Sequence, residues 1–373
     1  ARRAMSRASL EPLVMTISPP VDGVSGFFPS TATPVSPTLT VPNSATFLMN
    51  ALGLAESPVQ VYGFLNMSYF GNTHGTPADG LNAGVRPQRL ANQFMGNQFT
   101  VFVAKPLRPD REEDWGFTIT NLLGQDAALT RAQGFAGGPS TSSSWGNYDL
   151  LQVYGEYRAP VPGLGARGLE LKGGRFLSPL GYESILAPGR PLPTWSYQRA
   201  FAEPATLLGV WSTMNFGERL QVYNGAVNGW DRWVNENYRF SYVGGFRWSS
   251  GAGTCLSSMM ITGPNQFPMY LPGGTPTGYV PGEINRQYRD NRRTLFVTTL
   301  THRWSDTWTQ AIETTQAWEA KVPGLGAEGD RQNAEWYGFS HYLHWDASPE
   351  LSATWRFEIF RDDDGARTGV SDT

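Results

Sequence analysis

Apolar and polar side chains alternate along many short segments of this sequence from about residue 59 onward. In LSATWRFEIF (351–360), the odd positions are all apolar, and four of the five even positions are polar or charged. Successive side chains of a β-strand point to opposite faces, so this period predicts strands with one apolar and one polar face. We count about thirteen such segments of about ten residues each. That length crosses a bilayer when the strand is tilted.

The connections between these segments are alternately short and long. The short ones read LRPDREED, NFGER, SSGAGT, WSDT and DASPE. The long ones include residues 71–88, 123–147, 174–204 and 262–290. Antiparallel outer-membrane barrels have tight periplasmic turns at one rim and long extracellular loops at the other. The sequence therefore predicts an all-β fold, a transmembrane antiparallel up-and-down β-barrel. A soluble all-β fold is the alternative, because strands alternate there too.

Composition and charge exclude several other classes of protein. The formal net charge is −3, whereas a nucleic-acid binder normally carries a concentrated basic patch. Cys255 is the single cysteine, which excludes an internal disulfide framework and a multi-cysteine metal cluster. No run of eighteen apolar residues is present, so no transmembrane helix is expected. Tryptophans gather near the expected strand ends, as interfacial belts require: Trp115, Trp145, Trp248, Trp304, Trp308 and Trp345.

We expect the chain to divide into two parts. Residues 1–57 form a Pro/Ser/Thr-rich N-terminal extension with a short helix near 44–54, and residues 58–373 form the barrel. Pro58 ends the helix, since the residue before a proline avoids the helical region. The sequence ends on a polar loop, and bacterial single-chain barrels usually have an even number of strands. We therefore expect the last strands to follow this sequence, for a total of about 16.

Several motifs, in this order and spacing, resemble the OmpL-like putative β-barrel porin family of bacterial outer membranes. The strongest pieces are VYGFLNMSYFGN (61–72), DWGFTITNLLGQDA (114–127), LELKGGRFLSPLGYESILAPG (169–189), VNGWDRW (227–233), AEWYGFSHYLHWD (334–346) and RFEIFRDDDGAR (356–367). The resemblance runs from about Val59 to Gly365. It implies a location in the outer membrane of a Gram-negative bacterium and passive transport through a channel. It implies no particular solute.

The third long connection contains GYESILAPGRPLPTWSY (181–197), which is too broken for a strand and too aromatic for an ordinary solvated linker. Its prolines stiffen the backbone without needing amide partners. By analogy with the third loop of general porins, we expect it to fold into the lumen and narrow the pore. The candidate constriction residues are Tyr182, Glu183, Arg190, Trp195, Tyr197 and Arg199.

Charged residues on the polar faces of the strands are expected to line a water-filled lumen. They are Glu156, Glu170, Lys172, Arg239, Arg247, Arg356 and Glu358. Both signs of charge occur, so no strong ion selectivity follows. Any single one of them can instead be a wall charge paired across strands.

The expected function is an outer-membrane porin that passes small hydrophilic solutes by diffusion. A structural or partner-binding barrel without open-pore transport is the alternative, and the N-terminal extension favours it. GLGARG (163–168) matches a dinucleotide motif but precedes an alternating strand instead of a helix. We expect no enzyme activity, no cofactor, no metal and no nucleic-acid partner. The expected partners are outer-membrane lipid, lipopolysaccharide and small solutes, with a homo-oligomer or an envelope protein as further alternatives.

Overall fold

The computed structural model describes residues 47–54, 56–82, 84, 86–87, 90–132, 134, 147–165, 167–235, 239–264, 291–322, 332–348 and 350–368. Residues 1–46 of the expected N-terminal extension and the expected belt residue Trp145 lie outside these ranges. Among the residues described, no helix combines the length and the apolar character needed to span a membrane.

The described residues form thirteen strands and a few short helical turns. The strands are β1 (Gln60–Tyr69), β2 (Phe94–Lys105), β3 (Asp114–Leu123), β4 (Tyr148–Ala159), β5 (Leu169–Leu177), β6 (Thr206–Phe216), β7 (Leu220–Val227), β8 (Ser241–Ser249), β9 (Thr254–Gly263), β10 (Arg293–Arg303), β11 (Trp308–Val322), β12 (Gln332–Ser348) and β13 (Leu351–Asp362). The helical turns are α1 (Phe47–Ala51), α2 (Ala127–Thr130), the 3₁₀ turn η1 (Ala187–Gly189) and the π turn η2 (Gln198–Ala202).

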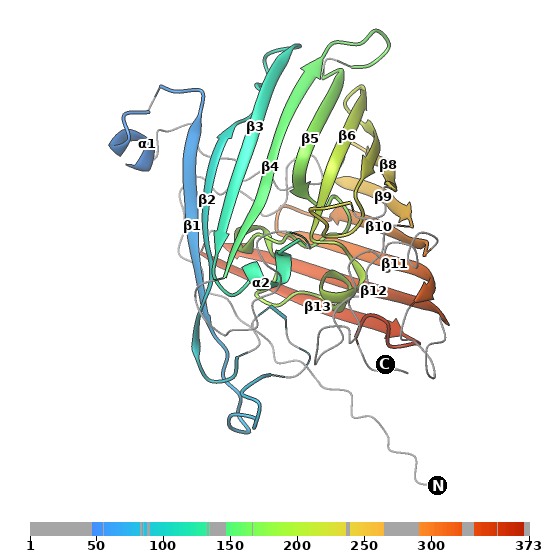
Figure 1. Cartoon of the computed structure of the whole chain (residues 1–373). Helices are drawn as coiled ribbons and strands as arrows, with labels where there is room; N and C mark the ends of the chain where they lie inside the picture. Colours follow the sequence, from blue (N-terminus) through green and yellow to red (C-terminus); the bar gives the residue numbers. More distant parts are fainter. Residues whose placement is uncertain are drawn as a thin grey trace.

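All thirteen strands belong to one sheet, and their spatial order is their order in the sequence. Each strand pairs antiparallel with the next, as in the register Gly63↔Val101 between β1 and β2 or His341↔Phe357 between β12 and β13. The sheet curves strongly, so that β1–β4 face β10–β13 across an enclosed space (Figure 1). This confirms the predicted up-and-down antiparallel architecture. The total of 16 strands stays a prediction.

The two ends of the strands differ as the connection lengths predict. Short turns join β2 to β3, β4 to β5, β6 to β7, β8 to β9, β10 to β11 and β12 to β13. Long connections follow β1 (70–93), β3 (124–147), β5 (178–205) and β7 (228–240). Figure 1 shows the β2–β3 and β4–β5 turns at the top and the β1–β2 connection at the bottom. We call these ends the short-turn rim and the long-loop rim.

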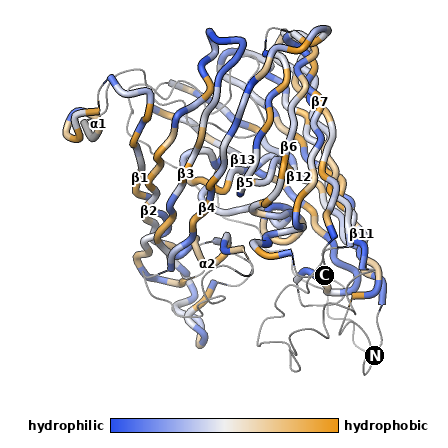
Figure 2. The backbone as a smooth tube through the Cα atoms, turned by 45° about the horizontal axis from the view of Figure 1, so that its top comes forward, coloured by the Kyte–Doolittle hydropathy of each residue, from blue (hydrophilic) through white to orange (hydrophobic). Residues whose placement is uncertain are grey.

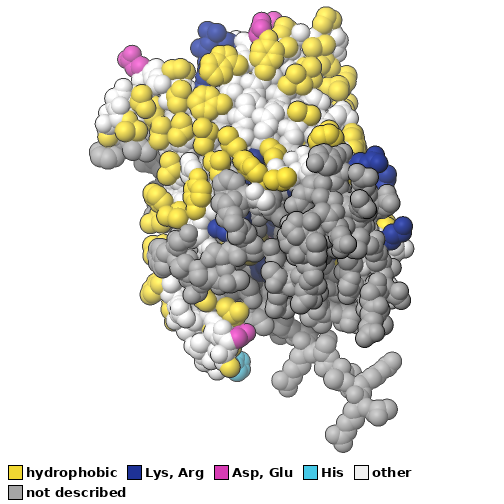
Figure 3. Space-filling view, viewed as in Figure 1, with side chains coloured by type: hydrophobic (Ala, Val, Ile, Leu, Met, Phe, Trp, Pro, Cys, Tyr) yellow, Lys and Arg dark blue, Asp and Glu magenta, His cyan; other side chains and the backbone are white. Residues whose placement is uncertain are grey.

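The outer face of the sheet is apolar and carries aromatic side chains near both rims. Hydropathy alternates along the strands (Figure 2), and hydrophobic side chains cover much of the outer surface in Figure 3. The exposed aromatic residues near the short-turn rim are Trp115, Tyr157, Phe216, Trp248, Trp304, Trp308 and Trp345. Those near the long-loop rim are Tyr69, Phe94, Tyr148, Phe240, Trp318 and Tyr337. Two such belts are typical of the two interfaces of a membrane.

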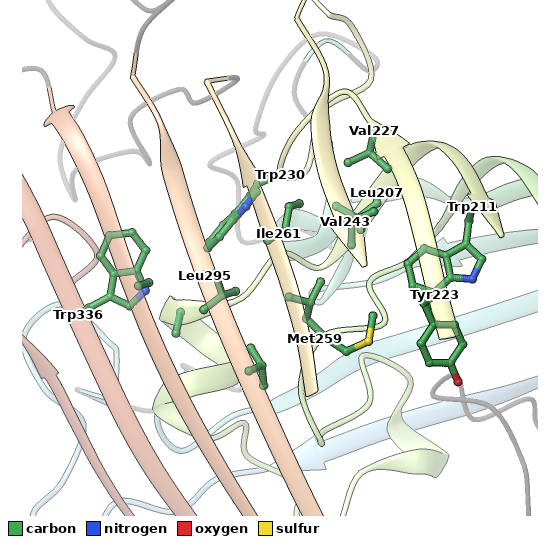
Figure 4. Packing of buried hydrophobic residues seen from close by; sticks show 14 of the residues in the cluster. Leu207, Trp211, Tyr223, Val227, Trp230, Val243, Met259, Ile261, Leu295 and Trp336 are labelled. Carbon is green, nitrogen blue, oxygen red and sulfur yellow. The ribbon is translucent and has the colours of Figure 1, made fainter. Parts of the chain in front are cut away.

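The inner face is organised in rows of residues at equal height across the strands. One buried row runs through Val243, Ile261, Leu295, Ala317 and Trp336 (Figure 4). The next row toward the long-loop rim contains Gly263, Arg293, Glu319 and Ala334. An apolar row thus lies beside a charged one on the inner wall.

Arg239 departs from its predicted strand position. β8 begins at Ser241, so Arg239 precedes the strand and belongs to the β7–β8 connection. The side-chain amide of Asn235 donates to the Arg239 carbonyl at 2.9 Å. That bond joins two residues within the same connection.

Candidate functional site

The connection between β5 and β6, residues 178–205, lies inside the curve of the sheet, between its two walls (Figures 1 and 2). We call it the β5–β6 loop. Pro188, Pro191 and Pro193 lack a backbone N–H, so this irregular stretch has fewer donors to satisfy when it is enclosed. Its helical content is limited to η1 and η2. Elsewhere its backbone groups bond to other backbone atoms, to the loop's own side chains and to side chains of the surrounding strands.

On one wall, the loop binds β2 and the start of the β3–β4 connection. The Gln98 amide donates to Asp126 Oδ2 at 2.8 Å and to the Ile185 carbonyl at 2.9 Å. The Ala187 N–H donates back to Gln98 Oε1 at 3.0 Å. Arg190 Nη2 forms a buried ion pair with Asp126 Oδ2 at 2.8 Å. We call Gln98, Asp126 and Arg190 the β2 anchor.

Burial dominates the electrostatics of the β2 anchor. The Asp126 carboxyl is fully enclosed, and loss of solvation raises its pKa, while Arg190 and Gln98 partly oppose that rise. The guanidinium of Arg190 also lies 5.1 Å from the ring centroid of Trp195. The backbone N–H of Trp195 donates to the Arg86 carbonyl at 2.7 Å. The first long connection therefore also contacts the loop.

On the other wall, Glu183 is the centre of a buried network with β12 and β13. Its carboxylate accepts from the Ser196 N–H at 2.7 Å and from the Tyr342 hydroxyl at 3.0 Å, and pairs with Arg356 at 3.1 Å. Arg356 also donates to the Thr194 carbonyl at 2.8 Å.

Arg356 pairs in addition with Glu358, its neighbour on the same face of β13, at 3.2 Å. Glu358 accepts from the Tyr197 N–H at 2.7 Å. We call Glu183, Arg356 and Glu358 the β13 anchor.

The turn η2 is fixed to β11 and β12 by one glutamine. Gln198 donates to Ser340 Oγ at 2.6 Å and accepts from Thr315 Oγ1 at 2.6 Å. A glycine on β12 makes room for it, because a Cβ at Gly338 would lie 2.6 Å from Gln198 Cγ. Nearby, the Tyr182 N–H donates to Glu313 on β11, and the Tyr182 hydroxyl lies 3.2 Å from His344 Nε2.

Two carboxyl groups lie close together at the end of the loop. Glu203 pairs with Arg199 at 3.0 Å, and its charge interacts with that of Glu313 on β11. It packs on Gly181, where φ is +91° and a Cβ would lie 2.0 Å from Glu203 Oε2, so only glycine fits. Burial raises the pKa of Glu203 and the charge of Glu183 raises it further, against the opposing effect of Arg199. We call Glu203 and Glu313 the carboxyl pair.

The structure places the predicted site residues in two groups. Tyr182, Glu183, Arg190, Trp195, Tyr197 and Arg199 all lie in the β5–β6 loop, and Arg356 and Glu358 bind that loop from β13. Apart from Arg239, which lies in the β7–β8 connection at the long-loop rim, the other wall charges lie near the short-turn rim. There Arg158 and Arg167 pair with Glu170, Lys172 is in register with Glu156 and Arg247 donates to Cys255 Sγ at 3.0 Å.

Several residues that hold the loop did not come out of the sequence reasoning. They are Gln98, Asp126, Gln198, Glu203, Glu313, Ser340 and Tyr342. The alternation of β11 and β12 places Glu313, Ser340 and Tyr342 on the inner face, which was the available signal. Within the part of the chain that the structure describes, no group of three or more His, Cys, Asp or Glu side chains is arranged to hold a metal ion.

A family model described as "Putative beta-barrel porin-2, OmpL-like" matches residues 58–373. Comparison with curated proteins gave no match. Among solved structures, similarity is found to the outer membrane channel DcaP of Acinetobacter baumannii, with 11% identity, coverage of 82% of this chain and 79% of that chain, and a TM-score of 0.48. A mutant of Rh. blastica porin is 7% identical, with 82% and 99% covered and a TM-score of 0.36.

OccK8 (OprE) of Pseudomonas aeruginosa is 11% identical, with 82% and 94% covered and a TM-score of 0.28. With TM-scores this low, we base the assignment on the family model, which matches most of the sequence. The chain belongs to the OmpL-like β-barrel porin family of the bacterial outer membrane.

Proposed function

We propose that the β5–β6 loop forms the constriction of this porin, and that small hydrophilic solutes diffuse past it between the two walls. One observation carries the proposal: side chains fix the loop both to β2, through the β2 anchor, and to β11–β13, through Gln198 and the β13 anchor. A loop that only covered the outer rim would not need bonds to the inner faces of strands on both walls. The selectivity of such a pore depends on its width and on the charges at its narrowest point.

The candidate constriction residues act in this proposal mainly by positioning. Glu183, Arg190 and Arg199 are each buried and paired, so their charges are neutralised locally. Their main effect is to set the width of the passage. The more exposed wall charges Glu156 and Lys172 then act on solutes nearer the short-turn rim, where they face each other in register.

The outer face supports contact with outer-membrane lipid and, at the long-loop rim, with lipopolysaccharide, because an apolar band lies between two aromatic belts. Passage of solutes, with no catalytic step, accounts for the arrangement of the inner charges. Assembly into a homo-oligomer is compatible with the same outer face.

The experiment is a deletion of residues 184–196 with recording of single-channel conductance in planar bilayers. We expect larger conductance steps than in the unmodified protein, while heat-modifiable migration in detergent shows that the barrel still folds. Deletion of 73–76 at the exposed tip of the β1–β2 connection is the matched control and should leave conductance unchanged. Equal conductance after deletion of 184–196 would show that the loop does not narrow the pore. Absence of any conductance in the correctly folded protein would favour a structural or partner-binding barrel.

A further inference from the structure

Two tryptophans and two arginines converge on the inner face at the long-loop rim. Trp336 comes from the apolar row on β12, Arg293 is the first residue of β10, Trp230 belongs to the β7–β8 connection and Arg367 follows β13. The two indoles, both visible in Figure 4, meet edge to face at 89° with centroids 6.3 Å apart. We call these four residues the Trp–Arg cluster.

Both guanidinium groups lie against both rings. The central carbon of Arg293 is 4.6 Å from the Trp230 centroid and 5.8 Å from that of Trp336. The corresponding distances for Arg367 are 5.1 Å and 5.0 Å. Cation–π contact holds each pair together, and the shared distances place all four side chains around one point.

Three hydrogen-bond donors in this cluster have no partner among the described residues: Trp230 Nε1, Trp336 Nε1 and Arg367 Nη1. Their side chains are deeply buried, since the three residues are only 6%, 0% and 5% exposed. Other donors of the two arginines are used: Arg293 binds Glu319 through two nitrogens at 2.7 Å and 2.6 Å, and Arg367 Nε donates to the Phe201 carbonyl at 2.6 Å. The cluster therefore holds three buried, unpaired hydrogen-bond donors in fixed positions.

The acceptors nearby are fewer than the donors. Asp362, in register with Trp336, uses Oδ2 to accept from the backbone of Arg367 and from both donors of Thr368, and its Oδ1 is one buried acceptor without a partner. Indole and guanidinium groups only donate. A water molecule accepts two hydrogen bonds, whereas a carboxylate or phosphate group offers more acceptor sites in one rigid unit.

We propose that the Trp–Arg cluster binds the oxyanion group of a small solute, a carboxylate or a phosphate, at the outer entrance of the pore. Trp230 Nε1, Trp336 Nε1 and Arg367 Nη1 donate to its oxygens, and Arg293 keeps both rings in place. This inference deepens the proposed function and rests on it for its role in transport. Binding itself does not depend on conductance.

The two arginines of the cluster differ in their pairing. Arg293 pairs with Glu319, while no carboxylate is hydrogen-bonded to the Arg367 guanidinium among the described residues. Burial and the nearby charge of Arg293 lower the pKa of Arg367 to about 9, although Glu319, Asp362 and Asp231 oppose that shift. A bound anion would offset this loss of solvation at Arg367, whose Nη1 has no partner among the described residues.

The test measures binding and block separately on the full chain in detergent and in planar bilayers. Sodium acetate and sodium phosphate are titrated against sodium chloride at equal ionic strength, by calorimetry and by reduction of single-channel current from the long-loop side. Arg367→Gln should raise the dissociation constant about tenfold, as expected for loss of a hydrogen bond to a charged group. Trp336→Phe and Trp230→Phe each keep an aromatic ring but remove the indole N–H, and each should raise the dissociation constant about threefold.

Arg219→Gln in the exposed β6–β7 turn removes the same charge at the opposite rim, so it should leave binding unchanged. Heat-modifiable migration checks that each variant folds. Binding of acetate alone identifies a carboxylate solute, and binding of phosphate alone identifies a phosphorylated one; either supports the site. If neither anion binds, or if both phenylalanine variants and Arg367→Gln bind as the unmodified protein does, the donors are merely hydrated and the proposal is overturned. Binding without any conductance would instead contradict the proposed function and leave the site standing.

Discussion

The two walls hold the β5–β6 loop by different chemistry. The β2 anchor uses one amide, one carboxylate and one arginine, and two of its bonds go to loop backbone atoms, the Ile185 carbonyl and the Ala187 N–H. The other wall uses the β13 anchor, Gln198 and the carboxyl pair, and there charged groups of both signs are crowded together. The second wall also binds loop backbone atoms, the Tyr197 N–H and the Thr194 carbonyl. The two walls therefore differ in how many charged groups make these contacts.

The largest effect is expected from Arg356→Gln, which removes the cation shared by Glu183 and Glu358. Breaking a buried ion pair leaves an uncompensated charge and costs about 3–5 kcal/mol. We expect the free energy of unfolding in detergent micelles to fall by about that amount and single-channel conductance to rise. Arg361→Gln on the same strand is the control, because its pair with Asp363 is exposed and such pairs contribute about 0–1 kcal/mol. Equal losses in both variants would show that the β13 anchor does not hold the loop.

Asp126→Asn tests the opposite wall and should have a smaller effect. Asparagine keeps the shape and one acceptor for Gln98 and Arg190, and burial already disfavours the charged form of Asp126. We expect a loss of about 1–3 kcal/mol from the weaker bond to Arg190, measured by the same unfolding titration. A loss larger than that of Arg356→Gln would reverse the ranking of the two walls.

The carboxyl pair predicts that the β11–β13 wall responds to pH. The pKa of Glu203 in the folded protein is raised above its ordinary value of 4.5, so the unfolded chain loses this proton first and stability falls as pH rises above about 4.5. The charged groups that act on Glu203 are Glu183 and Arg199 from the loop and Glu313 from β11. Glu183 is in turn bonded to Tyr342 from β12 and to Arg356 from β13, and His344 from β12 contacts Tyr182.

Ionisation of Glu203 beside Glu313 and Glu183 adds like charges, whereas Arg199 and Arg356 offset part of them. The loop should therefore be held most tightly at acidic pH, and single-channel conductance should increase between pH 5 and pH 9. Because a change of pH leaves every anchor residue in place, we expect a smaller change in the free energy of unfolding than from Arg356→Gln or Asp126→Asn. Glu203→Gln should flatten the profile, and Asp231→Asn is the matched control for another buried carboxyl with a raised pKa. A profile unchanged by Glu203→Gln would assign the pH response to other groups.

The smallest effect is expected from Tyr182→Phe, which removes one hydroxyl from the β12 contact while the ring stays against Tyr342. Loss of a single neutral hydrogen bond costs about 1 kcal/mol. Tyr69→Phe on the exposed outer face is the control and should cost less. An unchanged free energy of unfolding in Tyr182→Phe would mean that the bond from the Tyr182 backbone N–H to Glu313 alone positions this residue.

The alternation of apolar and polar residues within the strands, and of short and long connections between them, was sufficient to predict the sheet. Each depends on local sequence: alternation over ten residues and the length of the next connection. The same logic identified the loop at 181–197 and its charged residues. It could not identify their partners, because Glu183 and Arg356 lie 173 residues apart and Gln198 and Ser340 lie 142 apart. Which inner position faces which loop residue follows from the curvature of the whole sheet.

Arg239 shows the limit of alternation at strand ends. Its position in YRFSYVGGFRW fits the period, but β8 begins only at Ser241, and the Arg239 carbonyl accepts from Asn235 within the preceding connection. Trp230 and Arg367 illustrate the same point for the entrance. Neither lies in a strand, and their approach to Trp336 depends on how two connections fold over the inner wall.

The bonds from the β5–β6 loop to both walls also constrain the order in which this protein folds. Pairing of consecutive strands closes short chain segments and can proceed stepwise, whereas contacts far apart in the sequence carry a larger entropic cost of closure. Contacts such as Tyr342 to Glu183, 159 residues apart, cannot form until β12 has reached the sheet. In the proposed function, the passage would therefore be wide while the barrel assembles and would narrow late in maturation. A protein that has inserted but not yet bound this loop should admit solutes that the finished porin excludes.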